Sequence, residues 1–115
     1  MIVVELESLE VFGRHGVLEE ERRDGMTFLY DVRLDVGDGA LSDRIEDAVD
    51  YRDVVACVRE VSDAHAYHLL EALAGALADE LASRFPVESV YVRVREPEVV
   101  LDPPVEYAAV VATRP

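Results

Sequence analysis

The sequence contains no lysine and no tryptophan, and it has a single cysteine, Cys57. One cysteine excludes an intramolecular disulfide and is typical of a protein in a reducing compartment. No basic N-terminal start is followed by an apolar run, and no apolar run is long enough to span a bilayer. We therefore expect a cytoplasmic protein with no signal peptide and no membrane partner.

Positive charge is also scarce. All 11 basic residues are arginines, against 25 acidic residues, and the formal net charge is −14. Such an excess of negative charge repels nucleic acid and anionic lipid, so neither is an expected partner. Half of the 115 residues are apolar, which is enough for one compact core, and no linker or repeat divides residues 1–115. A single domain is expected.

Four segments show the alternation of polar and apolar residues that is typical of half-buried strands. They span residues 2–13, 27–37, 89–96 and 105–114. In the first segment the alternation changes phase near Ser8 and Leu9, which predicts a β-bulge. The third segment ends in Glu96, which has the same parity as its valines, and Pro97 then ends the ladder.

Two further segments have helical periodicity. Residues 50–64 form an amphipathic pattern with Asp50 as the N-cap, and residues 68–85 carry a leucine stripe that ends at Pro86. The connections at 14–25 and 38–49 are polar and contain turn residues. The order of elements predicts an α+β fold, in which a four-stranded antiparallel sheet has both helices on one face (ββααββ).

The other face of this sheet is predicted to be mixed in character rather than a second apolar layer. Its residues are Arg33, Asp35, Tyr91, Arg93 and Arg95. A face of this kind can line a water-filled space between subunits, and closure into an oligomer protects the two open edges of a sheet. We therefore expect a closed homo-oligomer.

Two groups of acidic residues each have two interpretations. Glu71 lies in the first turn of the second helix, where a carboxylate complements the helix dipole. Its two oxygens can also accept hydrogen bonds from adjacent N–H groups of a pterin or guanine-like ring. Glu19, Glu20 and Glu21 form a charged run that is typical of solvated loops, although the turn at Gly16 can direct one of them into a cleft.

The tyrosine, histidine and cysteine residues are ambiguous by themselves. Tyr51 follows the N-cap Asp50 and either packs or donates a hydrogen bond at a site. His15, His65 and His68 could bind zinc, but no further cysteine or carboxylate pattern accompanies them, so we expect no metal. Cys57 lies among valines and is expected to be a buried, inert thiol.

Four motifs together resemble one family. They are "FGRHGVLEEERRDG", "DAVDY", "HLLEALA" and "VRVREP", in this order along nearly the whole chain. They resemble the dihydroneopterin aldolases of folate biosynthesis. The resemblance implies the tunnelling fold, whose subunits close into rings that form a barrel, as a tetramer or as an octamer of two stacked rings.

The resemblance also implies a reaction without a cofactor or metal. These enzymes cleave 7,8-dihydroneopterin by a retro-aldol reaction to 6-hydroxymethyl-7,8-dihydropterin and glycolaldehyde. Carried over by position, Glu71 and the Leu70 backbone hold the pterin ring, and Val49 lines the pocket. Tyr51 of a neighbouring subunit takes part in proton transfer, and Glu21 contacts the hydroxylated side chain.

One position departs from the family pattern. The corresponding strand of the family ends in Lys-Pro, and that lysine is the main acid/base group, whereas this chain has Glu96-Pro97. Three functions therefore stay open: an aldolase in which Glu96 is an altered catalytic group, an epimerase of a related pterin, and a non-catalytic oligomer that binds pterins or purines. We expect an enzyme, an aldolase of weak activity.

Overall fold

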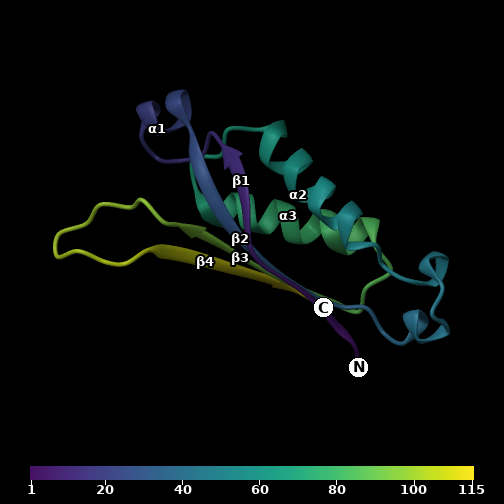
Figure 1. The fold of residues 1–115 in the computed structure, drawn as a ribbon. Coiled ribbons are helices and arrows are strands. Elements are labelled where there is room, and N and C mark those ends of the chain that lie inside the picture. The colour runs from purple at the N-terminus through teal and green to yellow at the C-terminus, as the bar shows by residue number, and fades with distance from the viewer.

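The computed structural model describes all 115 residues of the chain. Its helices and strands are β1 (Val3–Gly13), α1 (Glu19–Asp24), β2 (Met26–Asp35), α2 (Tyr51–Ala64), α3 (Leu70–Arg84), β3 (Ser89–Glu96) and β4 (Ala108–Arg114), with two 3-10 turns at Gly39–Ser42 and Ile45–Asp47. The strands form one antiparallel sheet in the order β1-β2-β3-β4, and α2 and α3 cover one of its faces (Figure 1). The predicted α+β architecture is confirmed.

The core lies between the sheet and the two long helices. Alternate residues of the two central strands face it, and these residues are almost completely buried: Phe28, Tyr30, Val32 and Leu34 of β2 and Val90, Val92 and Val94 of β3. The leucine stripe of α3 packs against them, as does Cys57 of α2. Burial of each large apolar side chain contributes about 1.5–3 kcal/mol, so this layer dominates the stability of the fold.

The predicted bulge in β1 is present. Ser8 has a positive φ of 56°, and the pairing of β1 with β2 shifts register between Leu6 and Leu9. The Ser8 amide donates a hydrogen bond to Asp31 Oδ1 at 2.8 Å. Because one extra residue is accommodated here, Leu6 and Leu9 both pack against the core although they are three positions apart.

An ion cluster lies on the sheet face away from the helices. Asp31 is 2% exposed, and its Oδ1 accepts a hydrogen bond from Arg95 Nη2 at 2.8 Å, with Arg93 Nε at 3.9 Å from Oδ2. Burial opposes ionisation, but the Ser8 amide and Arg95 outweigh it and lower the pKa of Asp31. Both guanidinium groups also stack near the Tyr107 ring. This side of the sheet is therefore not a second apolar layer, as expected, and it is partly filled by its own ion pairs.

Two predicted segments differ from the structure by more than two residues. The connection at 14–25 contains the short helix α1, and the fourth strand begins at Ala108 instead of residue 105. Pro103 and Pro104 have no amide hydrogen for a β-ladder, so residues 97–107 form a loop that extends away from the body of the protein (Figure 1). Asp50 caps α2, as predicted, by accepting a hydrogen bond from Arg52 N at 2.9 Å. None of the helices is long and apolar enough to cross a membrane.

Candidate active site

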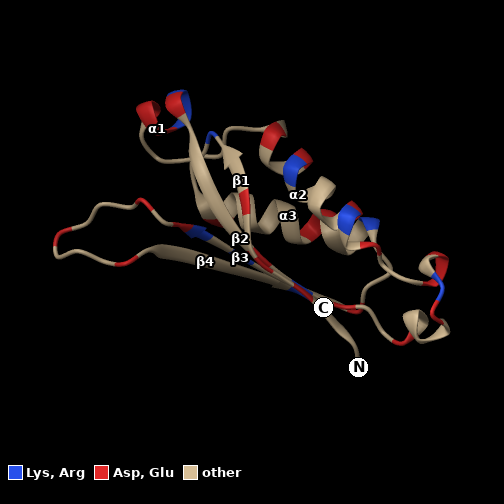
Figure 2. Cartoon of the chain, in the orientation of Figure 1, with Lys and Arg blue, Asp and Glu red and all other residues tan.

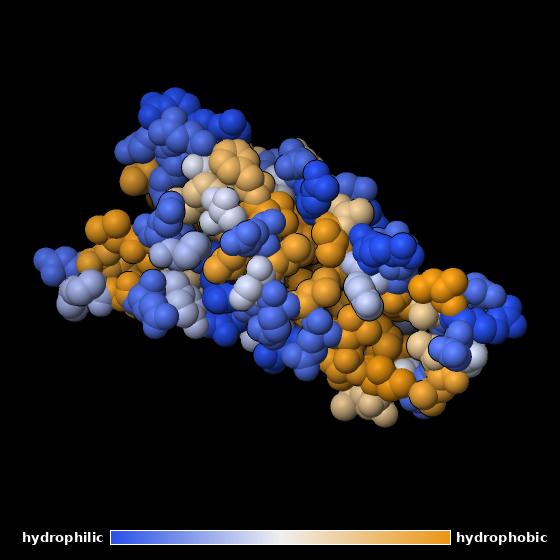
Figure 3. Space-filling model, viewed as in Figure 1, coloured by the Kyte–Doolittle hydropathy of each residue, from blue (hydrophilic) through white to orange (hydrophobic).

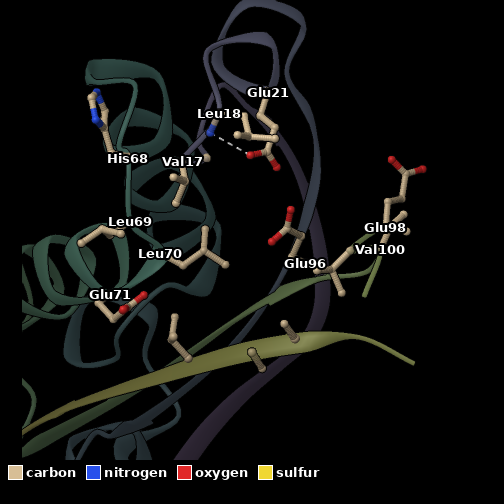
Figure 4. Close-up of a pocket in the computed structure, with 15 residues that line it drawn as sticks. Val17, Leu18, Glu21, His68, Leu69, Leu70, Glu71, Glu96, Glu98 and Val100 are labelled. Carbon is tan, nitrogen blue, oxygen red and sulfur yellow. Dashed lines mark hydrogen bonds between the residues drawn. The ribbon is translucent and has the colours of Figure 1, made fainter. Parts of the chain in front are cut away.

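A pocket of about 550 Å³ opens where four segments meet. Its walls are the turn that leads into α1, the start of α3, the end of β3 with the following loop, and the start of β4 (Figure 4). Nine of its 15 lining residues are hydrophobic, and the charged ones are all acidic: Glu21, Glu71, Glu96 and Glu98. Acidic side chains are concentrated on α1 and recur along the loop after β3 (Figure 2). The pocket thus combines apolar walls with negative charge.

Strand parity places Glu96 in this pocket. It follows the buried series Val90, Val92 and Val94 on the face of β3 that is turned toward the helices, so its side chain points to the same side as theirs. The helices do not cover this end of the strand completely, and Glu96 is half-buried rather than enclosed. A carboxyl group therefore stands at the edge of the core and faces the pocket.

Glu21 enters the pocket because the preceding turn is tightly fixed. Its Oε1 accepts a hydrogen bond from the Leu18 amide at 3.0 Å, and Arg22 Nη1 donates to the Gly16 and Val17 carbonyl oxygens at 2.8 and 2.7 Å. A Cβ atom at Gly16 would lie only 2.7 Å from the Glu21 Cβ. Glycine at position 16 is therefore what allows Glu21 to pack against the turn.

The carboxyl groups of Glu21 and Glu96 point toward each other in the pocket (Figure 4). Burial raises the pKa of Glu96, and the nearby Glu21 raises it further by charge repulsion. The neutral form of Glu96 is therefore more favoured than that of an exposed glutamate, and a carboxyl group in this form has a proton that it can donate.

Glu71 and Leu70 lie on the opposite wall, at the beginning of α3 (Figure 4). Glu71 is exposed and forms no ion pair or side-chain hydrogen bond within the chain. Both of its oxygens are thus free to accept hydrogen bonds from a bound molecule, and the apolar Leu70 side chain lies beside it. Four of the six predicted site residues meet in one pocket: Glu21, Leu70, Glu71 and Glu96.

The other two predicted residues do not line this pocket. Tyr51 is 57% exposed at the start of α2, at the end of the molecule away from α1 (Figure 1). Val49 is half-buried and packs against the hydrophobic core. Within a single chain, neither contributes to the space that contains Glu71 and Glu96.

Sequence reasoning missed some pocket residues. Glu98 and the start of β4, Ala108–Val110, line the pocket, but the sequence shows only a loop and a strand there. His68 also lines the pocket, whereas His15 is buried elsewhere and is hydrogen-bonded to Ser62. No group of three or more His, Cys, Asp or Glu residues is arranged to hold a metal ion.

Comparison with known proteins gives consistent matches. The family model described as "FolB: Dihydroneopterin aldolase" matches residues 4–113. A dihydroneopterin aldolase of Methylorubrum extorquens is 36% identical over 109 residues, covering 92% of this chain and 84% of the relative. The structure of Escherichia coli dihydroneopterin aldolase in complex with neopterin has a TM-score of 0.90 at 24% identity and covers 100% of both chains. A dihydroneopterin aldolase of Burkholderia thailandensis bound to guanine has a TM-score of 0.82 at 22% identity, covering 98% of this chain and 89% of the other.

Proposed function

This chain belongs to the dihydroneopterin aldolase family, and on that basis we propose that it binds 7,8-dihydroneopterin and cleaves it weakly to 6-hydroxymethyl-7,8-dihydropterin and glycolaldehyde. The observation that carries the proposal is the arrangement of three carboxyl groups. Glu71 lies on one wall of the pocket, and Glu21 and Glu96 lie together on the opposite wall (Figure 4). One wall therefore suits ring binding, and the other suits proton transfer.

Ring binding is assigned to Glu71 and Leu70. A pterin ring presents an exocyclic amine beside a ring N–H, and the two oxygens of Glu71 accept both hydrogen bonds in parallel. The Leu70 backbone and the apolar lining of the pocket hold the flat ring in place. No Lys or Arg side chain lines the pocket, and all of its carboxyl groups repel an anion, so a ligand with a phosphorylated side chain is disfavoured.

Proton transfer is assigned to the Glu21–Glu96 pair. In retro-aldol cleavage a side-chain hydroxyl loses its proton, the adjacent carbon–carbon bond breaks, and the electron pair enters the ring imine, which is then protonated. Glu21 accepts a hydrogen bond from the hydroxylated side chain, and the raised pKa of Glu96 increases the fraction of this group that has a proton to give. The negative charge that surrounds them opposes removal of the hydroxyl proton, so we expect slow cleavage.

A complete site is proposed to form between subunits of a homo-oligomer. Tyr51 lies outside its own chain's pocket and exposes its phenol group, so we assign it to proton transfer in a neighbouring chain, with Val49 lining that pocket. Exposed apolar residues support association, and they include Met1, Leu41 and Ile45. Figure 3 shows apolar surface toward the end of the molecule that carries the N-terminus, in contrast to the hydrophilic surface over α1. The outer edges of β1 and β4 also have no neighbouring strand within the chain, so each is available to pair with another subunit.

A non-catalytic pterin- or purine-binding oligomer is the second candidate. It is favoured by Glu96 itself, because a carboxylate replaces the group on which catalysis in the family depends while Glu71 is retained. Guanine presents the same amine and ring N–H pair as a pterin, so the same wall of the pocket can bind it.

The deciding experiment is an assay of the purified protein with 7,8-dihydroneopterin, in which pterin products are separated by chromatography. We expect slow formation of 6-hydroxymethyl-7,8-dihydropterin that speeds up at mildly acidic pH, where more Glu96 is protonated. Glu71→Ala is the control for contaminating enzyme and should abolish the product. Binding of neopterin without any product would establish the second candidate instead, and an altered side-chain configuration would indicate epimerase activity.

A further inference from the structure

His15 lies completely buried at a junction outside the pocket. Its Nδ1 accepts a hydrogen bond from the Tyr67 amide at 3.1 Å, and its Nε2 lies 3.1 Å from Ser62 Oγ. Because Nδ1 is an acceptor, the ring is neutral with its hydrogen on Nε2, which donates to Ser62. The Ser62 hydroxyl in turn donates to the Phe12 carbonyl oxygen at 3.3 Å. The imidazole therefore has a defined partner on each side.

The ring is also tightly packed. The centroids of Phe28 and Tyr67 lie 5.4 and 5.5 Å from that of His15, and a Cβ atom added at Gly13 would lie 2.5 Å from His15 Nε2. The backbone at the end of β1 packs directly against the imidazole, and a side chain at Gly13 would displace the His15 ring. His15 thus has little freedom to move away from Tyr67.

The bond to Tyr67 connects the two walls of the pocket. The Gly16 amide donates to the Tyr67 carbonyl oxygen at 2.9 Å, so two consecutive residues bind both backbone groups of Tyr67. One wall, which includes Glu21, starts directly after His15, and the other, which includes Glu71, starts directly after Tyr67. These are the only two hydrogen bonds between residues 14–24 and residues 66–71, so this junction constrains the relative position of the walls.

We propose that His15 is a positioning residue that sets the separation of the two pocket walls through its hydrogen bond with Tyr67. The ligand-binding part of this inference rests on the proposed function, since the ligand must contact Glu71 and the Glu21 side of the pocket together. His15 itself does not contact the ligand. Its effect is on affinity, because walls that move independently must be ordered when the ring binds.

Three substitutions separate the two hydrogen bonds of the ring. In His15→Asn, the amide oxygen lies near the position of Nδ1 and can still accept from Tyr67, whereas the donor to Ser62 is lost. In His15→Gln, the longer amide reaches the position of Nε2 and keeps the Ser62 contact, but the acceptor for Tyr67 is lost. Ser62→Ala removes the other partner and leaves the Tyr67 bond intact.

The first measurement is the affinity for neopterin by calorimetry, at a temperature where circular dichroism shows every variant to be folded. We expect His15→Gln to bind about tenfold more weakly than the native protein, and His15→Asn and Ser62→Ala to remain within about threefold. Native-like affinity of His15→Gln would overturn the proposal. The proposal would also be overturned if the affinities of the variants followed the order of their melting temperatures. That result would mean that His15 stabilises the fold as a whole and does not position the two walls.

The second measurement is amide hydrogen exchange without a ligand. His15→Gln should speed up exchange at residues 16–21 and 67–71 while the sheet stays protected, and His15→Asn should restore slow exchange. Uniformly faster exchange in both variants would contradict the proposal. Should the native protein bind neither neopterin nor guanine, the proposed function is wrong, and the exchange rates still decide whether His15 joins the walls.

Discussion

Glu21 and Glu96 direct their carboxyl groups toward each other, and no Lys or Arg side chain lines the pocket that they share (Figure 4). The pair comes from two segments that are distant in sequence, the short helix α1 and the end of β3. Where the family resemblance leads one to expect an ammonium group, this protein has a second carboxyl group, and burial together with the proximity of Glu21 raises the pKa of Glu96.

Glu96→Gln should stabilise the protein at neutral pH. The unfolded chain has the ordinary Glu96 pKa of 4.5, whereas burial and Glu21 raise it in the folded state. The folded state therefore binds more protons between these two pKa values, and this contribution to stability is present at lower pH and is lost as the pH rises through the folded pKa. Glutamine has no charge to bury, so the variant should melt at a higher temperature than the native protein at pH 8 and show a smaller difference at pH 5.

The matched control is Glu98→Gln, which removes an exposed carboxylate from the same pocket. It should not reproduce the pH-dependent gain. Equal gains from both variants would show that total pocket charge, and not the Glu21–Glu96 contact, destabilises the native protein.

Glu96→Lys should accelerate cleavage of 7,8-dihydroneopterin by about tenfold or more, because an amine at this position, beside the Glu21 carboxyl group, can supply and accept the proton that the reaction moves. Initial rates of product formation provide the measurement, with Glu98→Lys as the control for added positive charge. No gain in a variant that still binds neopterin would place the defect in the loop at residues 97–107.

Glu71→Gln should weaken neopterin binding by roughly a hundredfold, or about 2–3 kcal/mol. The glutamine amide presents a donor to a ligand donor, and the charge-assisted pair of hydrogen bonds is lost. Asp53→Asn removes a carboxylate from the first turn of α2 and is the control for a helix-dipole effect. Calorimetry that finds unchanged affinity for Glu71→Gln would limit Glu71 to the dipole role.

Mixing two defective variants should restore activity if Tyr51 acts in a neighbour's pocket. Tyr51→Phe and Glu71→Ala each damage every site of their own oligomer. In mixed oligomers formed by joint refolding, a chain with intact Glu71 can lie beside a chain with intact Tyr51, and random assortment makes about a quarter of the sites native. Activity that stays at the level of the separate variants would place Tyr51 in its own chain's site, or outside any site.

Asp31→Ala should destabilise the fold by about 3 kcal/mol, because it leaves Arg95 without its buried partner. Unfolding in urea measures the loss. Arg23→Ala removes an ion pair with Asp24 in which both side chains are about two-thirds exposed, and it should leave the unfolding curve nearly unchanged. Similar losses in the two variants would mean that burial of Asp31 does not govern its contribution.

The sequence predicts most of the fold because its signals are local. Alternation identifies the strands, the phase change at Ser8 identifies the bulge, and parity alone directs Glu96 toward the pocket. The helix α1 was missed because its six residues are all charged and none is buried, so it has no apolar periodicity to detect. The late start of β4 also has no local signal apart from the two prolines.

The candidate site is less predictable because it depends on tertiary structure. Family resemblance identifies Glu21, Leu70 and Glu71, and the fold brings them together with Glu96. Glu98 was missed since a loop residue's position depends on the whole path of the chain. Tyr51 lies outside the pocket of its own chain, and the role proposed for it needs a second copy of the protein, which the pattern of one chain does not describe.

The composition of the loop at residues 97–107 determines which proteases can cut it. It extends from the body and contains no lysine or arginine, so trypsin has no cleavage point there. A glutamate-specific protease can cut after the exposed Glu98 and Glu106. Glu98 lines the pocket and Glu106 does not, so a bound ligand will slow the first cut more than the second. The ratio of cleavage after Glu98 to cleavage after Glu106, measured from the fragment masses, therefore reports whether the pocket is occupied.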